Sequence, residues 1–113
     1  MNTYTPNRWI MLKFTELKTG RITYKILAGW LGGYTGSDSW KLSSGTESIE
    51  ETEHYFLCPQ FSGSTYKLVK DLWGTSRLTM DILNEFADEL EAKPGFATME
   101  ALAEGVIPIG VLQ

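Results

Sequence analysis

The period of the apolar and polar positions changes along the chain, and this change predicts strands first and a helix later. Residues 9–14 form a short apolar run whose length and aromatic content favour a buried strand. Residues 22–28 alternate with a period of two, which indicates a strand with one more polar face. The polar segment 15–20 ends in glycine and predicts a turn. The two runs therefore predict a hairpin.

A similar pattern returns later in the chain. Residues 54–58 are rich in aromatic side chains and predict another strand, and Pro59 indicates an edge position or the strand's end. Residues 62–64 predict a tight turn, and residues 65–70 alternate again. With a short alternation at 40–42, the pattern predicts a meander of about five strands.

Two segments of this region, residues 19–27 and 62–69, resemble each other in sequence. Each follows an aromatic-rich run, and each is followed by tryptophan and glycine. One explanation is that turn-plus-strand chemistry converges on similar residues. The other is that the chain builds two equivalent hairpins in one sheet.

The C-terminal third predicts an amphipathic helix. At 100° per residue, five apolar side chains fall on one stripe about 140° wide. These residues are Leu78, Leu83, Ile82, Phe86 and Leu90. Ser76 or Thr79 can cap the start of the helix, and Lys93 suits the negative end of its dipole. Pro94 and Gly95 stop it.

The residues after this helix are less regular. Residues 98–104 suggest a second short helix, and an apolar tail follows. An apolar tail is expected to dock, either as an edge strand of its own sheet or on a partner chain. The second alternative makes a homo-oligomer a candidate. Its interface residues would be Val106, Ile107, Ile109, Val111 and Leu112.

These patterns predict one α+β domain over residues 1–113. Its parts are a β-rich region at 8–70, a helical region at 76–104 and an apolar tail at 105–113. The predicted architecture is an antiparallel sheet of about five strands, made of two hairpins plus a short strand. A C-terminal amphipathic helix packs on one face of it, which buries the apolar sides of both elements.

Composition and charge narrow the classes of function. The net charge of −4 argues against nucleic acid and anionic membranes as partners, because no long basic patch reverses it. Arg21 and Lys25 are close in sequence, but acidic residues interrupt anything longer. No apolar stretch is long enough to predict a membrane span. Cys58 is the one cysteine and the N-terminus does not resemble a signal peptide, so we expect a cytoplasmic protein without an intramolecular disulfide.

Catalytic and metal-binding patterns are sparse. His54 and Cys58 would lie about 13 Å apart on one strand, too far for a nucleophile and its base. The acidic stretch 47–53 lacks the several Cys or His ligands of a zinc site and is expected to be a solvated turn. The sequence therefore predicts no catalytic residues, no metal and no cofactor.

The glycine-rich segment 29–40 breaks all periodicity. Its aromatic faces could stack on a ligand, and its polar side chains could orient that ligand. The candidate binding residues are Trp30, Tyr34, Asp38, Ser39 and Trp40. The alternative is structural, with the glycines turning a corner while Trp30 and Trp40 close one end of the core.

Residues 4–70 also resemble a group of small uncharacterised bacterial proteins associated with mobile DNA, such as integron gene cassettes and prophages. The segments that carry the resemblance are Tyr4-Thr5-Pro6, Trp9, Ala28-Gly29-Trp30, Gly32-Gly33-Tyr34, Gly36, Asp38-Ser39-Trp40-Lys41-Leu42, Ser44-Gly45, Ser62-Gly63-Ser64 and Tyr66. The glycine and tryptophan segment is the specific part. The group has no assigned activity, so the resemblance implies an accessory role and transfers no functional residue.

Three hypotheses of function follow from the residues. The first is a non-enzymatic binding or protein-interaction module of a bacterial mobile element. The second is a small ligand-binding protein or enzyme with a pocket between sheet and helix. The third is an acidic inhibitor of a host or phage protein. A concave pocket with convergent polar groups would favour the second hypothesis.

Overall fold

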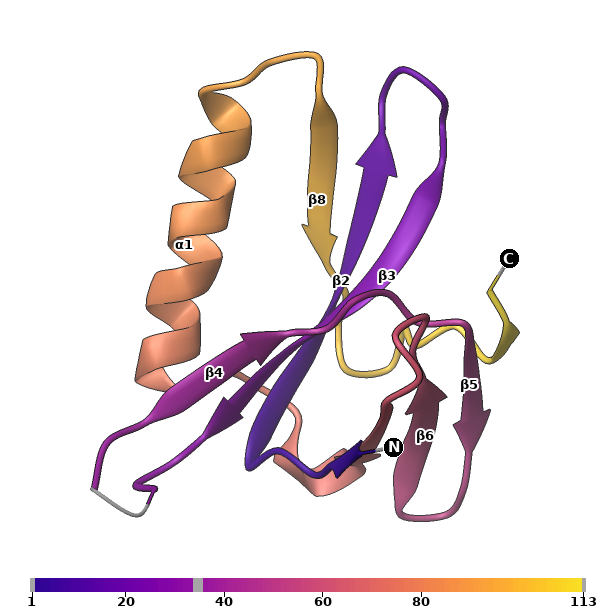
Figure 1. Cartoon of the computed structure of the whole chain (residues 1–113), viewed down its shortest axis with the longest axis vertical. Helices are drawn as coiled ribbons and strands as arrows, with labels where there is room; N and C mark the ends of the chain where they lie inside the picture. Colours follow the sequence, from indigo (N-terminus) through magenta and orange to yellow (C-terminus); the bar gives the residue numbers. More distant parts are fainter. Residues whose placement is uncertain (1, 34–35, 113) are drawn as a thin grey trace.

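Two β-sheets and one α-helix make up the computed structural model, which describes residues 2–33 and 36–112 (Figure 1). The predicted α+β class is confirmed. The helix and the second sheet cover opposite faces of a central four-stranded sheet, as the two core clusters show. The middle of the central sheet, at residues 9–12 of β2 and 26–29 of β3, is therefore buried on both sides.

The central sheet is antiparallel throughout. Its strands run in the order β4 (Ser39–Leu42), β3 (Ile22–Trp30), β2 (Arg8–Glu16) and β8 (Ala97–Ala101). The first predicted hairpin is confirmed, since β2 and β3 pair along eight positions from Arg8↔Gly29 to Thr15↔Ile22.

The second sheet has five strands and is mixed. Its order is β1 (Thr3–Tyr4), β7 (Thr65–Val69), β6 (Tyr55–Pro59), β5 (Ser48–Glu51) and β9 (Gly110–Val111). Strand β1 pairs with β7 in parallel, and the other pairs are antiparallel. The prediction of one antiparallel sheet of about five strands is therefore wrong, and the two predicted hairpins lie in different sheets.

The apolar run that begins β2 gives the physical reason for the second sheet. Successive strand side chains point to opposite faces, so Ile10 and Leu12 join the core beneath the helix. Trp9 and Met11 join the core between the sheets. A single sheet covered by one helix would leave these last two side chains in water.

The predicted helix is confirmed as α1 (Arg77–Glu91), which runs beside β8 in Figure 1. Ser76 caps it, because its hydroxyl accepts a hydrogen bond from the Thr79 amide at 3.1 Å. The Ser76 amide in turn donates to the Thr79 hydroxyl at 2.8 Å. Ile82 is the most deeply buried apolar residue of α1, and Leu78, Leu83 and Phe86 pack beside it. A 3₁₀ turn, η1 (Lys70–Leu72), precedes the helix.

The prediction of a second helix at 98–104 is wrong. Residues Ala97–Ala101 form strand β8, which pairs with β2 in the register Phe14↔Met99. The predicted helical region 76–104 is thus helical only to Glu91, and α1 is followed by two more strands. The open edge of β2 offers this segment hydrogen bonds along five positions, and that pairing overrides its weak local preference.

The apolar tail docks on its own chain as the edge strand β9. Ser48 pairs with Val111, and the Leu112 amide donates to the Glu47 carbonyl at 2.9 Å. Ile107 and Leu112 pack against the core between the sheets, which confirms the edge-strand alternative. Val106, Ile109 and Val111 remain exposed, and the homo-oligomer stays a prediction.

Candidate functional site

A groove opens between the C-terminal half of α1 and the outer part of the β2–β3 hairpin. We call it the helix–sheet groove; its volume is about 380 Å³. Its apolar lining consists of Phe14, Leu42, Phe86, Leu90, Phe96 and Ala97. Phe96 is 63% exposed, so an aromatic ring stands at the rim in water. An apolar cavity of this size is typical of small-molecule sites.

The N-terminal end of α1, away from the groove, is closely packed against the central sheet. Gly29 of β3 lies under the start of the helix, where an added methyl group would stand 2.9 Å from Thr79 Cγ2. The N-terminal end of α1 therefore rests directly on the sheet. At the C-terminal end, Phe86 and Leu90 face the groove instead of a tightly packed strand.

Four charged side chains line the groove. Arg21 and Lys25 come from β3 and the turn before it, whereas Glu16 ends β2 and Glu89 lies on α1. Lys25 is half-buried, and its ammonium lies 5.9 Å from the centre of the Phe14 ring. Glu16, Arg21 and Glu89 are exposed. In the described part of the chain, ion pairs join Glu53 to His54 and Glu51 to Lys70, and none involves the groove.

The predicted binding residues of the glycine-rich segment are only partly brought together. Trp30, Ser39 and Trp40 line an open hollow of about 390 Å³ at the edge strand β4, which we call the Gly/Trp hollow. Asp38 does not line it; its carboxylate accepts a hydrogen bond from the Gly32 amide at 2.9 Å and so closes the loop. Tyr34 lies outside the described residues.

The two tryptophans belong to different layers. Trp30 packs against the core between the sheets, with its ring 6.2 Å from that of Tyr4. Trp40 is 40% exposed, and its ring lies 6.0 Å from that of Phe86 on the helix. Part of each side chain thus serves packing, which supports the structural interpretation of this segment.

Sequence reasoning missed the other four residues that line the Gly/Trp hollow, which are Thr3, Tyr4, Thr5 and Lys41. The Lys41 ammonium lies 4.6 Å from the centre of the Tyr4 ring. Hydrogen bonds from Asn2 and then Lys41 lower the pKa of the Tyr4 hydroxyl. No local pattern marks Tyr4, because β1 has two residues and forms only by pairing with β7.

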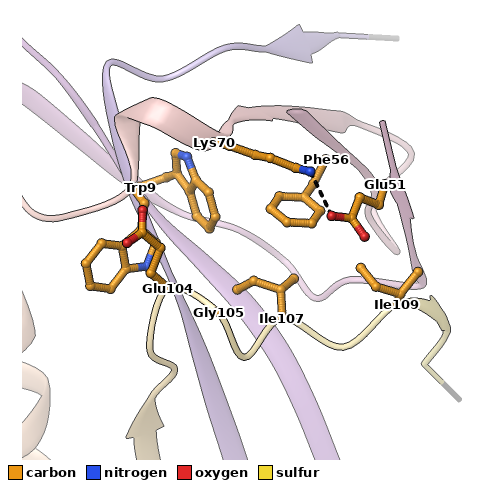
Figure 2. A pocket seen from close by; sticks show the side chains of 9 residues that line it. Trp9, Glu51, Phe56, Lys70, Glu104, Gly105, Ile107 and Ile109 are labelled. Carbon is orange, nitrogen blue, oxygen red and sulfur yellow. Dashed lines mark hydrogen bonds and ion pairs between the residues drawn. The ribbon is translucent and has the colours of Figure 1, made fainter. Parts of the chain in front are cut away.

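A smaller cleft of about 280 Å³ lies between the tail and the second sheet. Figure 2 shows this tail cleft, with Ile107 and Ile109 on one side and Trp9 and Phe56 on the other. Lys70 reaches across it, 5.2 Å from the centre of the Phe56 ring, and pairs with Glu51 at 2.7 Å. The chain's own ion pair thus occupies the polar part of the cleft.

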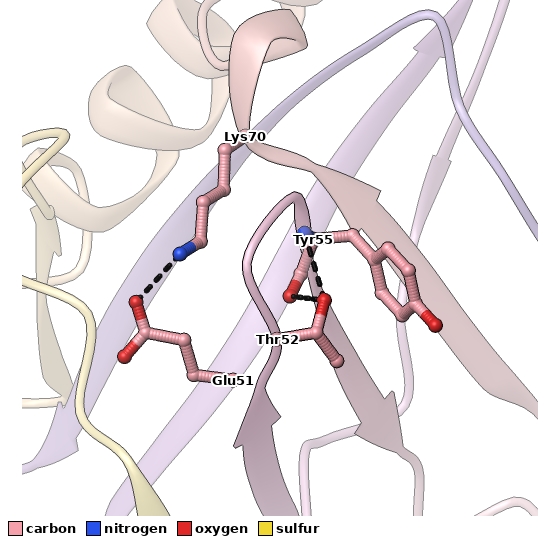
Figure 3. Close-up of polar contacts among 4 residues, drawn as sticks. All are labelled: Glu51, Thr52, Tyr55 and Lys70. Carbon is pink, nitrogen blue, oxygen red and sulfur yellow. Dashed lines mark hydrogen bonds and ion pairs between the residues drawn. The ribbon is translucent and has the colours of Figure 1, made fainter.

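The turn between β5 and β6 holds Glu51 in this position. Figure 3 shows the Thr52 hydroxyl donating to the Tyr55 carbonyl at 2.9 Å and accepting from the Tyr55 amide at 3.1 Å. These two bonds close the turn directly after Glu51 and place its carboxylate opposite Lys70. The Glu51–Lys70 pair is therefore a structural element of the second sheet.

The histidine and the cysteine of the chain lie in different environments. His54 has an 81% exposed side chain and lies 3.7 Å from the Glu53 carboxylate. Cys58 is fully buried, and this burial raises the pKa of its thiol to about 12. Within residues 2–33 and 36–112, no three His, Cys, Asp or Glu side chains are grouped so that they could hold a metal ion.

No helix in the described ranges is both long and apolar enough to cross a membrane. Comparison with protein-family models, curated proteins and solved structures finds no match to this chain.

Proposed function

We propose that this protein is a non-enzymatic binding module that takes an apolar ligand into the helix–sheet groove. The observation that carries the proposal is the groove itself, a cavity of about 380 Å³ lined by apolar side chains from both layers. Pockets that bury most of a small ligand are lined in this way. The proposal joins the first two hypotheses drawn from the sequence, a binding module and a pocket between sheet and helix.

The tail cleft and the Gly/Trp hollow support a ligand less well. The tail cleft is smaller, and two of its three charged side chains, Glu51 and Lys70, are already paired with each other. The Gly/Trp hollow is shallow and has little apolar lining, since Tyr4, Trp30 and Trp40 are engaged in packing contacts. The helix–sheet groove combines an apolar floor with two basic side chains, Arg21 and Lys25, that form no ion pair within the described residues.

A neutral apolar dye, N-phenyl-1-naphthylamine, tests the proposal. Its fluorescence should rise on binding to the native chain because the dye leaves water. The variant Ala97→Phe places a ring in the groove from strand β8 and should weaken dye binding about tenfold or more. Circular dichroism of the variant should match that of the parent.

Ala87→Phe is the matched control, because Ala87 is exposed on α1 and does not line the groove. It should leave dye binding unchanged. Equal binding by both variants, or no binding by the folded parent chain, would refute the groove as the ligand site.

The resemblance to small bacterial proteins of mobile DNA supports an accessory role for such a binding module. Residues 28–42 carry most of that resemblance, and they include Leu42 of the groove. Capture of a bound small molecule from the native host, with Ala97→Phe as the negative control, would connect this role to the groove. A molecule recovered equally with both proteins would not be its ligand.

A further inference from the structure

The charged side chains of the helix–sheet groove lie at different depths. Lys25 is half-buried, and its ammonium makes a cation–π contact 5.9 Å from the centre of the Phe14 ring. Among residues 2–33 and 36–112 its ammonium has neither an ion pair nor a hydrogen bond. The inner polar group of the groove is therefore an unpaired cation.

Arg21 places a second cation on the same wall of the groove. Its guanidinium is likewise unpaired in the described residues, because the hydrogen bonds of Arg21 come from its backbone. Positions four residues apart on a strand lie on the same face about 13 Å apart, so the two cations raise the positive potential of one wall without meeting at one point.

The acidic side chains of the groove are less able to bind a ligand's head group. Glu16 is exposed and accepts a hydrogen bond from the Thr19 hydroxyl at 3.0 Å, which directs its carboxylate toward the turn. Glu89 is exposed on α1, where water solvates its charge. Lys25 is more buried than either glutamate, and charge interactions strengthen away from water. The groove therefore favours a negatively charged head group on its ligand.

We infer that the ligand of the groove is an amphipathic monoanion, with an apolar chain or ring over Phe14, Phe86 and Leu90 and a carboxylate on Lys25, at the wall where Arg21 adds a second positive charge. This inference rests on the proposed function and specifies its ligand class. The four charges that line the groove sum to zero, so recognition depends on the position of each charge and not on the net charge of −4.

Three ligands with the same eight-carbon chain test the inference: octanoate, octanol and octylamine. Isothermal titration and amide chemical shifts should show all binding in one groove, with shifts at Thr23, Lys25 and Ala97. Octanoate should bind about tenfold more tightly than octanol, a difference of about 1.4 kcal/mol. Octylamine should bind more weakly than octanol, and added salt should weaken octanoate binding.

The variant Lys25→Met keeps the length of the side chain and removes its charge. It should reduce octanoate affinity about tenfold, so that the preference of the groove for octanoate over octanol is lost. Lys18→Met is the control, because Lys18 is an exposed residue of the β2–β3 turn outside the groove. It should change the affinity for neither octanoate nor octanol. Arg21→Gln should give a smaller loss for octanoate alone, because Arg21 is more exposed.

The outcomes separate this inference from the proposed function. If octanol and octanoate bind the groove equally well, or octylamine binds best, the inferred carboxylate head group is wrong. The groove would still be a binding site. If none of the three shifts the groove amides, the proposed function fails as well. Octanoate shifts confined to Lys41 and its surroundings would also overturn the inference.

Discussion

At the scale of single residues, Gly29 decides how closely the helix approaches the central sheet. A methyl group there would stand 2.9 Å from Thr79 Cγ2 and 3.2 Å from Ser76 Oγ. Thr79 cannot easily move, because its hydroxyl and amide both bond to Ser76 in the helix cap. One small residue thus couples the strand to the cap of α1.

We expect Gly29→Ala to lower the free energy of unfolding by about 1–3 kcal/mol, the usual cost of overfilling a packed site. Urea denaturation measures it. The control is the same change in a Thr79→Ser background, which removes Cγ2 and keeps the capping hydroxyl. There the cost should fall below about 1 kcal/mol. An equal cost in both backgrounds would contradict the proposed contact.

At the scale of elements, neighbouring residues of the C-terminal tail lie in different environments. Leu112 packs against the core between the sheets, whereas Val111 is 81% exposed. Strand β9 holds both by pairing with β5. Adjacent residues of this tail therefore have different roles, one in docking and the other in forming the outer surface.

Leu112→Lys should destabilise the chain by about 1–3 kcal/mol, because it would bring a charge to the core's edge. Val111→Lys should change stability by less than about 0.5 kcal/mol, since its side chain is already in water. Thermal unfolding of the two variants gives the comparison. Equal losses would mean that the tail is not docked as described.

Val111→Lys also tests the predicted homo-oligomer, because it changes the exposed surface and leaves the docked strand intact. If the exposed tail residues join protomers, the parent chain should sediment as an oligomer and the variant as a monomer. Monomeric mass for both proteins would remove the homo-oligomer from consideration.

At the scale of the whole molecule, the central sheet belongs to two cores at once. Ile10 faces the helix and Ile26 faces the second sheet, and both side chains are at least 96% buried. Strands β2 and β3 pair along their length, so neither core can open without disturbing the strands of the other. We expect the chain to unfold as one cooperative unit.

The matched variants Ile10→Val and Ile26→Val should each cost about 0.5–1.5 kcal/mol. Each should shift one common transition, followed by far-ultraviolet circular dichroism and by tryptophan fluorescence in urea. A separation of the two probes in the Ile10→Val variant, with the helix signal lost first, would show that the helical layer is an independent unit.

Local sequence determined the elements whose partners are close along the chain. The β2–β3 hairpin follows from two apolar runs joined by a short turn, and α1 follows from its apolar stripe and the Ser76 cap. In both elements the hydrogen bonds are local, so the residue pattern alone specifies them. Arg21 and Lys25 are also close in sequence, so the residue pattern alone identifies them as neighbouring basic residues.

Tertiary structure alone decided the rest. Residues 97–101 become a strand only because β2 offers a free edge far away in sequence, and the two sheets separate because β2 needs cover on both faces. The helix–sheet groove joins Phe14, Phe86 and Phe96 from three distant segments. Such long-range packing leaves no local period. The sequence therefore offered a pocket between sheet and helix only as one alternative, and it marked no residue of the groove as a binding residue.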